Sequence, residues 1–139
     1  YDPSKSKYPI QVLSSASHYF IGDSFQSVPR LQAMQSRPTV EMSVSDAKER
    51  NVKDGDLVRI YNEQGETYCY AVIIDGLLDG VCATQKQFKG SNTPNGLNVN
   101  NLNSEMLTDF GKSPTFYSVL AEIEKASEEM SNKAIKQGA

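Results

Sequence analysis

The sequence predicts a mainly β protein with short helices. Its 139 residues suffice for one ordinary domain, and a hydrophobic fraction of 38% with abundant Gly, Asn and Ser favours a loop-rich β fold over a helix bundle. The longest strand-like run, residues 66–74, carries apolar or aromatic side chains on both of its alternating faces. A strand covered on both faces fits a closed barrel better than an open, one-sided sheet.

Strand-like alternation of apolar and polar residues recurs along the whole chain. The expected strands are residues 8–14, 39–42, 57–62, 66–74, 81–85 and 119–123. Ile10 and Val12 share one face of the first strand, and Val40 and Met42 alternate inward in the second. The last strand is expected to close the sheet.

Short helical segments are expected at two places between these strands. One is a helical turn at residues 31–34, after Pro29. Residues 46–50 suit a short helix, with Ser45 or Asp46 available to accept hydrogen bonds from its free N–H groups.

Glycine and acidic residues mark the turns. Gly55 lies between Asp54 and Asp56 and can take the positive φ that other residues resist. We interpret this acidic pair as turn residues rather than as a metal or acid–base site. Residues 63–65 then reverse the chain as a hairpin turn, and residues 75–80 form a further connection with two glycines.

Two longer segments have neither a strand period nor a helix period. Residues 14–25 are rich in hydroxyl groups, contain several aromatic residues and include a turn at Gly22. Residues 86–98 are rich in Lys, Gly, Asn and Pro. An asparagine cluster lies within this segment and just after it, and consists of Asn92, Asn95, Asn98, Asn100 and Asn101. The first segment is either a surface loop whose serines cap local backbone groups or a ligand-binding loop. The second is either functional or mobile, and turn propensity alone is the alternative for its asparagines.

Composition excludes several classes of function. A net charge of −3 and a pI near 5.1 argue against nucleic acid as an electrostatic partner. No apolar run approaches the roughly 18 residues of a membrane span. Cys69 and Cys82 lie in apolar runs and are expected to be free buried thiols, with a disulfide between them as the alternative. A single His cannot build a zinc site by itself.

The chain divides into three parts. Residues 1–7 are expected to be a polar linker, residues 8–125 one domain, and residues 126–139 a C-terminal tail or frayed helix with a weak apolar stripe. Because the chain starts at Tyr1, we expect it to be a piece of a longer polypeptide.

Three regions together resemble a known family. Residues 46–58 read Asp-Ala-x-x-x-x-Val-x-Asp-Gly-Asp-x-Val and are followed by Asn-x-x-Gly at residues 62–65. The serine-rich residues 13–25 precede them, and residues 99–103, Val-Asn-Asn-Leu-Asn, come later with an Asp-x-Gly at residues 109–111. In this order they resemble the C-terminal dinucleotide-binding domain of molybdopterin oxidoreductases, the superfamily of dimethyl-sulfoxide reductase and formate dehydrogenase. Asn103 stands where that family usually has Thr.

The resemblance implies a six-stranded double-psi β-barrel that holds part of a molybdopterin guanine dinucleotide, a cofactor of molybdenum or tungsten. A guanine edge and a ribose need neutral, directional hydrogen-bonding groups, and a pyrophosphate needs closely approaching backbone N–H groups. By position in the family pattern, the expected cofactor-binding residues are Ser14, Ser15, Ser17, His18, Ser24, Asn100, Asp109 and Gly111. Lys86 or Lys89 could add charge to a phosphate, and the alternative for each is a solvated lysine of the loop.

The resemblance also implies how the chain works with others. The metal would be bound by other domains of the parent catalytic subunit, and an iron–sulfur electron-transfer subunit is a further expected partner. We expect no catalysis by this chain alone, because its residues show no nucleophile, base and orienting group in one set. The alternative is a double-psi barrel for protein interaction or substrate handling, as in the N-terminal domains of some ATPases. A small pyruvoyl enzyme would need self-cleavage at Gly90-Ser91, and we give this little weight.

Overall fold

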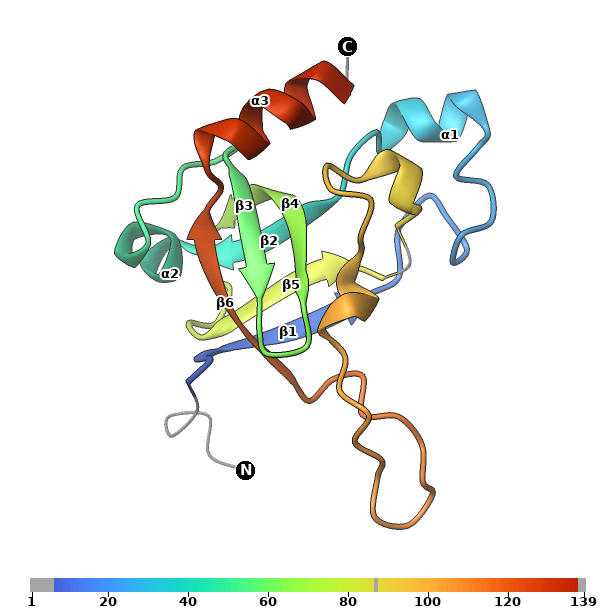
Figure 1. The fold of residues 1–139 in the computed structure, drawn as a ribbon, viewed down its shortest axis with the longest axis vertical. Coiled ribbons are helices and arrows are strands. Elements are labelled where there is room, and N and C mark those ends of the chain that lie inside the picture. Colours follow the sequence, from blue (N-terminus) through green and yellow to red (C-terminus); the bar gives the residue numbers. More distant parts are fainter. Residues whose placement is uncertain (1–6, 87, 138–139) are drawn as a thin grey trace.

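The computed structural model describes residues 7–86 and 88–137, and within these ranges six strands form a closed barrel (Figure 1). The strands are β1 (Ile10–Ser15), β2 (Thr39–Ser43), β3 (Leu57–Tyr61), β4 (Glu66–Ile74), β5 (Val81–Gln85) and β6 (Val119–Lys125). Their order around the barrel is β1-β5-β2-β4-β3-β6, and β6 pairs with β1 to close it. The prediction of a closed barrel, with the last strand closing the sheet, is confirmed.

The strand pairing mixes two directions. The pairs β1–β5 and β2–β4 are parallel, whereas the other four pairs are antiparallel. Among the six strands described, β3 and β4 alone are joined by a tight hairpin, so most neighbouring strands are far apart in the sequence. This is the six-stranded double-psi β-barrel that the resemblance implies.

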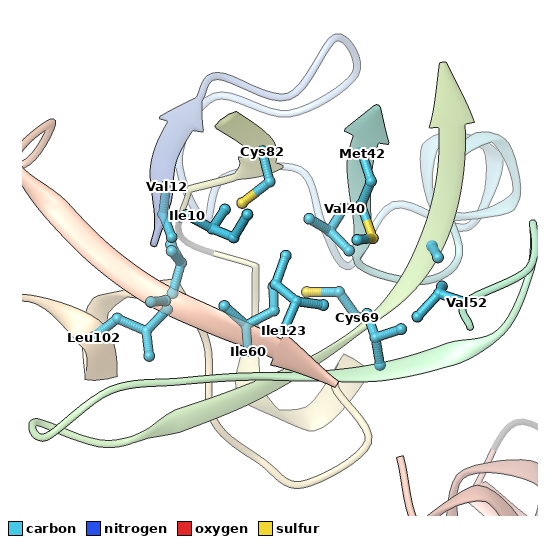
Figure 2. Packing of buried hydrophobic residues seen from close by; sticks show 14 of the residues in the cluster. Ile10, Val12, Val40, Met42, Val52, Ile60, Cys69, Cys82, Leu102 and Ile123 are labelled. Atoms are coloured by element: carbon cyan, nitrogen blue, oxygen red, sulfur yellow. The ribbon is translucent and has the colours of Figure 1, made fainter. Parts of the chain in front are cut away.

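The core fills the inside of the barrel. Figure 2 shows apolar side chains from all six strands pointing toward one another, with the sulfur atoms of Cys69 and Cys82 among them. The most deeply buried include Val40, Met42 and Ile60. Both thiols are free, and β4 and β5 do not pair with each other because β2 lies between them. The expectation of free buried thiols is confirmed.

Helices cover the outside and the ends of the barrel. They are α1 (Pro29–Met34), α2 (Val44–Glu49) and α3 (Glu128–Gln137), with the 3₁₀ turns η2 (Gly90–Asn92) and η3 (Val99–Leu102). Met130 of α3 packs with Leu57 and Tyr68, which face outward from β3 and β4. This packing explains why the longest strand is apolar on both faces. Among the described residues, no helix is both long and apolar enough to cross a membrane.

The helix α2 begins earlier than the sequence predicted. Its N-cap is Ser43, not Ser45 or Asp46, and the Ser43 hydroxyl accepts a hydrogen bond from the backbone N–H of Asp46 at 3.0 Å. Ser43 ends β2, so its backbone is already extended, as an N-cap requires. The predicted N-cap was wrong because it assigned the end of β2 and the N-cap of α2 to different residues, whereas Ser43 is both.

The predicted acidic turn has the expected structure. Gly55 has a φ of +82°. The Asp54 carboxylate accepts a hydrogen bond from the backbone of Ile73 at 2.9 Å, and the Asp56 carboxylate accepts one from the backbone of Lys53 at 2.9 Å. Both acids therefore tie the turn together, as their interpretation as turn residues predicts.

Candidate cofactor site

A cavity of about 570 Å³ opens beside the loop that follows β1. We call residues 16–28 the pocket loop. It leaves the barrel at the end of β1 and runs to the start of α1, at the upper right of Figure 1. The cavity is lined by Ala16, Ser17, His18, Tyr19, Phe20, Ile21, Gly22, Phe25 and Lys86. All but Lys86 belong to the pocket loop, and Lys86 directly follows β5, the parallel neighbour of β1.

The first half of the pocket loop is shaped by Ser17. Its hydroxyl accepts hydrogen bonds from the backbone N–H groups of Tyr19, at 3.1 Å, and Phe20, at 3.3 Å. The same hydroxyl donates to the side-chain oxygen of Gln35 at 2.5 Å. These contacts fix a tight turn around His18, so Ser17 contributes by holding the loop rather than by offering a free hydroxyl.

The second half is anchored by a buried glutamine. The side chain of Gln26 is only 1% exposed, donates to the carbonyl of Gly22 at 2.9 Å and accepts from the backbone N–H of Lys89 at 2.7 Å. Beside it, the rings of Phe20 and Phe88 meet edge to face with centroids 6.1 Å apart. The pocket loop is thus fastened to the segment after β5.

His18 and Lys86 line a cavity whose other lining residues are mostly apolar or aromatic. His18 is exposed and meets the ring of Tyr19 edge to face at 4.9 Å. Lys86 is exposed at the rim, and within residues 7–86 and 88–137 it forms no ion pair. Lys89, by contrast, reaches the hydroxyl of Ser27 at 3.4 Å. Of the two lysines considered from the sequence, Lys86 is the one that lines the cavity.

Two residues of the asparagine cluster, Asn98 and Asn101, cap η3. The side chain of Asn98 accepts from the backbone N–H of Asn100 at 3.0 Å and donates to the carbonyl of Phe88 at 3.1 Å. Asn101 completes a capping box by accepting from the backbone of Asn98 at 3.4 Å. The side chain of Asn100 remains exposed. Through Phe88 and Gln26, η3 and the pocket loop belong to one connected framework.

Asp109 and Gly111 lie elsewhere. Residues 103–118, which we call the excursion, extend from the barrel as a hairpin-like loop at the opposite end of the long axis from α1 (Figure 1). Both residues are exposed near its tip, next to the fully exposed ring of Phe110. The structure therefore does not bring them together with His18.

The remaining predicted serines lie just before the pocket loop and within it. Ser14 and Ser15 end β1, and the Ser15 hydroxyl donates to the carbonyl of Thr84 at 3.4 Å. Ser24 is exposed and closes a turn through its backbone bond to Ile21 at 3.0 Å. Of the eight predicted residues, Ser17 and His18 line the cavity.

The sequence did not single out Phe25 or Gln26. Phe88, an apolar residue in a polar run, was the one available signal that the segment after β5 is anchored. Among the described residues, no group of three or more His, Cys, Asp and Glu side chains is arranged to hold a metal ion.

Comparison with solved structures supports the fold. Acetylene hydratase from Pelobacter acetylenicus superposes with a TM-score of 0.76 over 86% of this chain, at 11% identity, and the match covers 19% of that protein. Identity this low relates the folds alone.

Sequence comparison identifies relatives that are much longer. The chain is 28% identical over 120 residues to the probable oxidoreductase YoaE of Bacillus subtilis, covering 86% of this chain and 18% of that protein. It is 36% identical over 84 residues to the dimethyl sulfoxide reductase DmsA of Haemophilus influenzae, covering 59% of this chain and 10% of that protein. The chain thus spans less than a fifth of the length of these relatives.

A family model described as the "Molydopterin dinucleotide binding domain" matches residues 10–120, which is most of the barrel and both candidate loops. This match includes the pocket loop, η3 and the excursion. The chain therefore belongs to the molybdopterin dinucleotide-binding domains of the molybdopterin oxidoreductase superfamily.

Proposed function

We propose that the chain binds the guanine form of the cofactor, molybdopterin guanine dinucleotide, with the cavity beside the pocket loop as its principal contact. The observation that carries this proposal is the cavity of about 570 Å³ in which His18 and Lys86 stand among aromatic side chains. Aromatic surfaces accept flat heterocycles, and a cation with hydrogen-bond donors suits a pyrophosphate. The lining therefore fits a dinucleotide by its chemistry.

The proposed contacts fall into two groups. The first group consists of Ser14, Ser15, Ser17, His18 and Ser24. Within it, Ser17 acts by shaping the loop. Asn100, Asp109 and Gly111 form the second. A dinucleotide carries its two ring systems at opposite ends of a pyrophosphate, so two separate groups of residues can contact one molecule. When bound, the metal carried by the pterin supplies the redox chemistry, and this chain's residues orient and retain the cofactor.

We further propose that the chain acts within a larger catalytic subunit, whose other domains hold the molybdenum or tungsten ion. An iron–sulfur electron-transfer subunit is the proposed redox partner. This proposal is supported by the length of the relatives, of which the chain spans 18% and 10%. The chain alone is expected to retain the cofactor without turning over a substrate.

The test uses the parent polypeptide isolated in its native state. Molybdenum, tungsten and the guanine nucleotide released on denaturation are measured together. We expect one guanine nucleotide equivalent for each cofactor, and a well-folded parent that contains neither metal nor guanine would contradict the proposal. The double variant His18→Ala, Asn100→Ala is expected to lower cofactor retention while leaving the fold unchanged, because both side chains are exposed. Unchanged occupancy would count against the assigned residues.

A further inference from the structure

Phe25 has a backbone conformation that phenylalanine rarely adopts. Its φ is +69°, in the left-handed region where glycine, asparagine and aspartate are the usual residues. Within residues 7–86 and 88–137, the other non-glycine residues with positive φ are Asn51, after α2, and Lys112, in the excursion. A bulky aromatic residue with this strained backbone indicates that the surrounding structure requires the conformation, the side chain or both.

The local chain explains what this conformation achieves. Ser24 closes one turn by bonding to Ile21, and Val28 closes the next by bonding to the carbonyl of Phe25 at 3.0 Å. Phe25 is the junction of the two turns. The reversal at this junction lets Gln26 enter the protein interior while the ring of Phe25 lines the cavity.

The ring of Phe25 is not a core residue. It is 53% exposed, although its neighbour Gln26 is almost completely buried. A glycine would make the same junction without backbone strain, and an asparagine would make it with little. We therefore attribute the presence of phenylalanine at this position to its aromatic ring, which faces the cavity.

We propose that Phe25 is the stacking residue of the cavity and selects a planar heteroaromatic ring of the bound dinucleotide. This inference rests on the proposed function, because it names the part of the ligand that the same cavity recognises. A half-exposed aromatic ring gives a flat apolar face against which a guanine or a pterin ring can stack. His18 and Lys86, on the same cavity, then contact the more polar part of the ligand.

The test separates stacking from stability with variants that suit a positive φ. Phe25→Gly and Phe25→Asn remove the ring but fit the backbone, whereas Phe25→Trp keeps an aromatic face. Phe116→Gly is the matched control, because that ring is also about half exposed, at 50%, but lies in the excursion. The ¹⁵N-labelled 139-residue chain is titrated with guanosine diphosphate, with a simple pterin and with inorganic pyrophosphate, and amide shifts of residues 16–25 are followed.

We expect Phe25→Gly and Phe25→Asn to bind one ring-containing probe about tenfold more weakly than the wild type does. Pyrophosphate binding should be unchanged and the melting temperature equal or higher, because the strain is relieved. Phe25→Trp and Phe116→Gly should bind as the wild type does. The probe that responds, guanosine diphosphate or pterin, identifies the ring.

Two results would overturn the inference. One is equal affinity of Phe25→Gly and the wild type for both ring-containing probes, which leaves the proposed function intact. The other is a lowered melting temperature with an equal loss of pyrophosphate binding, which would make Phe25 a structural residue. If the wild type binds none of the three probes, the proposed function fails first, and this inference fails with it.

Discussion

Asp46 is the residue at which three segments of the barrel meet. Its carboxylate accepts hydrogen bonds from the Ser43 hydroxyl at 2.9 Å and from the backbone of Gly80 at 2.8 Å. It also pairs with Arg50 at 3.4 Å, and Arg50 in turn donates to Glu122 of β6 at 2.7 Å. Burial disfavours the charged form of Arg50 and lowers its pKa, but the hydrogen bond to Glu122 and the negative charges of Glu122, Glu49 and Asp46 together outweigh this effect and raise the arginine pKa. The network joins α2, the β4–β5 connection and β6.

Asp46→Asn tests this network. We expect the free energy of unfolding to fall by about 2–4 kcal/mol, because a nearly buried carboxylate that neutralises Arg50 is lost. Glu49→Gln is the matched control, since Glu49 contacts the same guanidinium at 3.1 Å but its side chain is 75% exposed. That change should cost less than about 0.5 kcal/mol. Urea unfolding of both variants gives the comparison, and equal losses would contradict it.

The two buried thiols predict a pH dependence of stability. Burial raises the pKa of Cys69 from its ordinary 9.0 to about 12, and burial together with the nearby Cys69 raises the pKa of Cys82. Above pH 9 the unfolded chain loses thiol protons that the folded chain keeps. The free energy of unfolding should therefore fall as the pH rises from 9 toward 12, by about 1.4 kcal/mol per pH unit for each thiol.

The measurement is urea unfolding of the wild type and of a Cys69→Ala, Cys82→Ala double variant between pH 8 and 11. The alanine variant starts from a lower stability at pH 8 because it leaves small cavities, so only the slopes are compared. We expect the steeper decline in the wild type. Parallel profiles would show that the thiols do not contribute.

At the residue scale, the sequence predicted turns well and binding groups less well. Gly55 between two aspartates predicts a turn, because the backbone preferences of these residues alone determine the local structure. The hydroxyl of Ser17 was equally visible in the sequence, yet its bond partner Gln35 lies eighteen residues away. Whether a serine side chain is free for a ligand depends on tertiary contacts that local pattern does not contain.

At the scale of elements, the hairpin between β3 and β4 supports η3. Asn62 donates to the carbonyls of Leu102 and Leu120, each at 2.9 Å, and thereby joins the hairpin to η3 and β6. Gly65, on the same hairpin, lies against the backbone of Asn101 so closely that an added Cβ would stand 2.8 Å from its carbonyl oxygen. The Asn-x-x-Gly of the family pattern therefore holds the segment that carries Asn100.

Gly65→Ala should displace η3 from the hairpin. We expect a cost of about 1–3 kcal/mol and amide shifts concentrated in residues 98–103, because backbone cannot yield as a flexible side chain does. Gly76→Ala is the control: it has a φ of +87° but no atom within 4 Å of an added Cβ. Its cost should be limited to backbone strain of about 1 kcal/mol, with no shifts at η3. Similar shifts in both variants would contradict this role of Gly65.

The strands were predictable as elements, whereas the pocket loop was not. Period-two alternation identified every strand because each has one face in the core, as Ile10 and Val12 illustrate. The pocket loop has no period, and its shape depends on Gln26, whose partner Lys89 belongs to the segment after β5. The αL conformation of Phe25 has no signal in the sequence, because propensity alone predicts the opposite.

At the scale of the whole molecule, closure of the barrel fixes where the loops lie. The parallel pairing of β1 with β5 sets the end of β1, where the pocket loop begins, beside the end of β5, where Lys86 stands. Strand alternation predicts neither the parallel pairs nor their register, so this juxtaposition came from the structure. The antiparallel pairing of β6 with β1 and β3 leaves the excursion at the other end.

The excursion is built as a separate hairpin. Its hydrogen bonds are largely internal: Thr108 donates to Ser113 at 2.9 Å and Thr115 donates to Met106 at 3.3 Å. A bond from the Gln11 side chain to the carbonyl of Tyr117, at 2.9 Å, fastens its base to β1. The tip, residues 109–112, can therefore be changed without disturbing the barrel.

Replacing residues 109–112 by Asn-Gly tests whether the two proposed contact groups act separately. A two-residue Asn-Gly turn suits the antiparallel pair on either side, so the free energy of unfolding should stay within about 0.5 kcal/mol of the wild type. Guanosine diphosphate should bind the isolated, shortened chain as tightly as the wild-type chain, because the residues that line the cavity belong to the pocket loop and the end of β5, away from the excursion. In the parent subunit, cofactor retention should fall, because Asp109 and Gly111 are lost. Weakened nucleotide binding by the isolated chain would show that both groups contact the same end of the ligand, and full cofactor retention by the parent would remove Asp109 and Gly111 from the site.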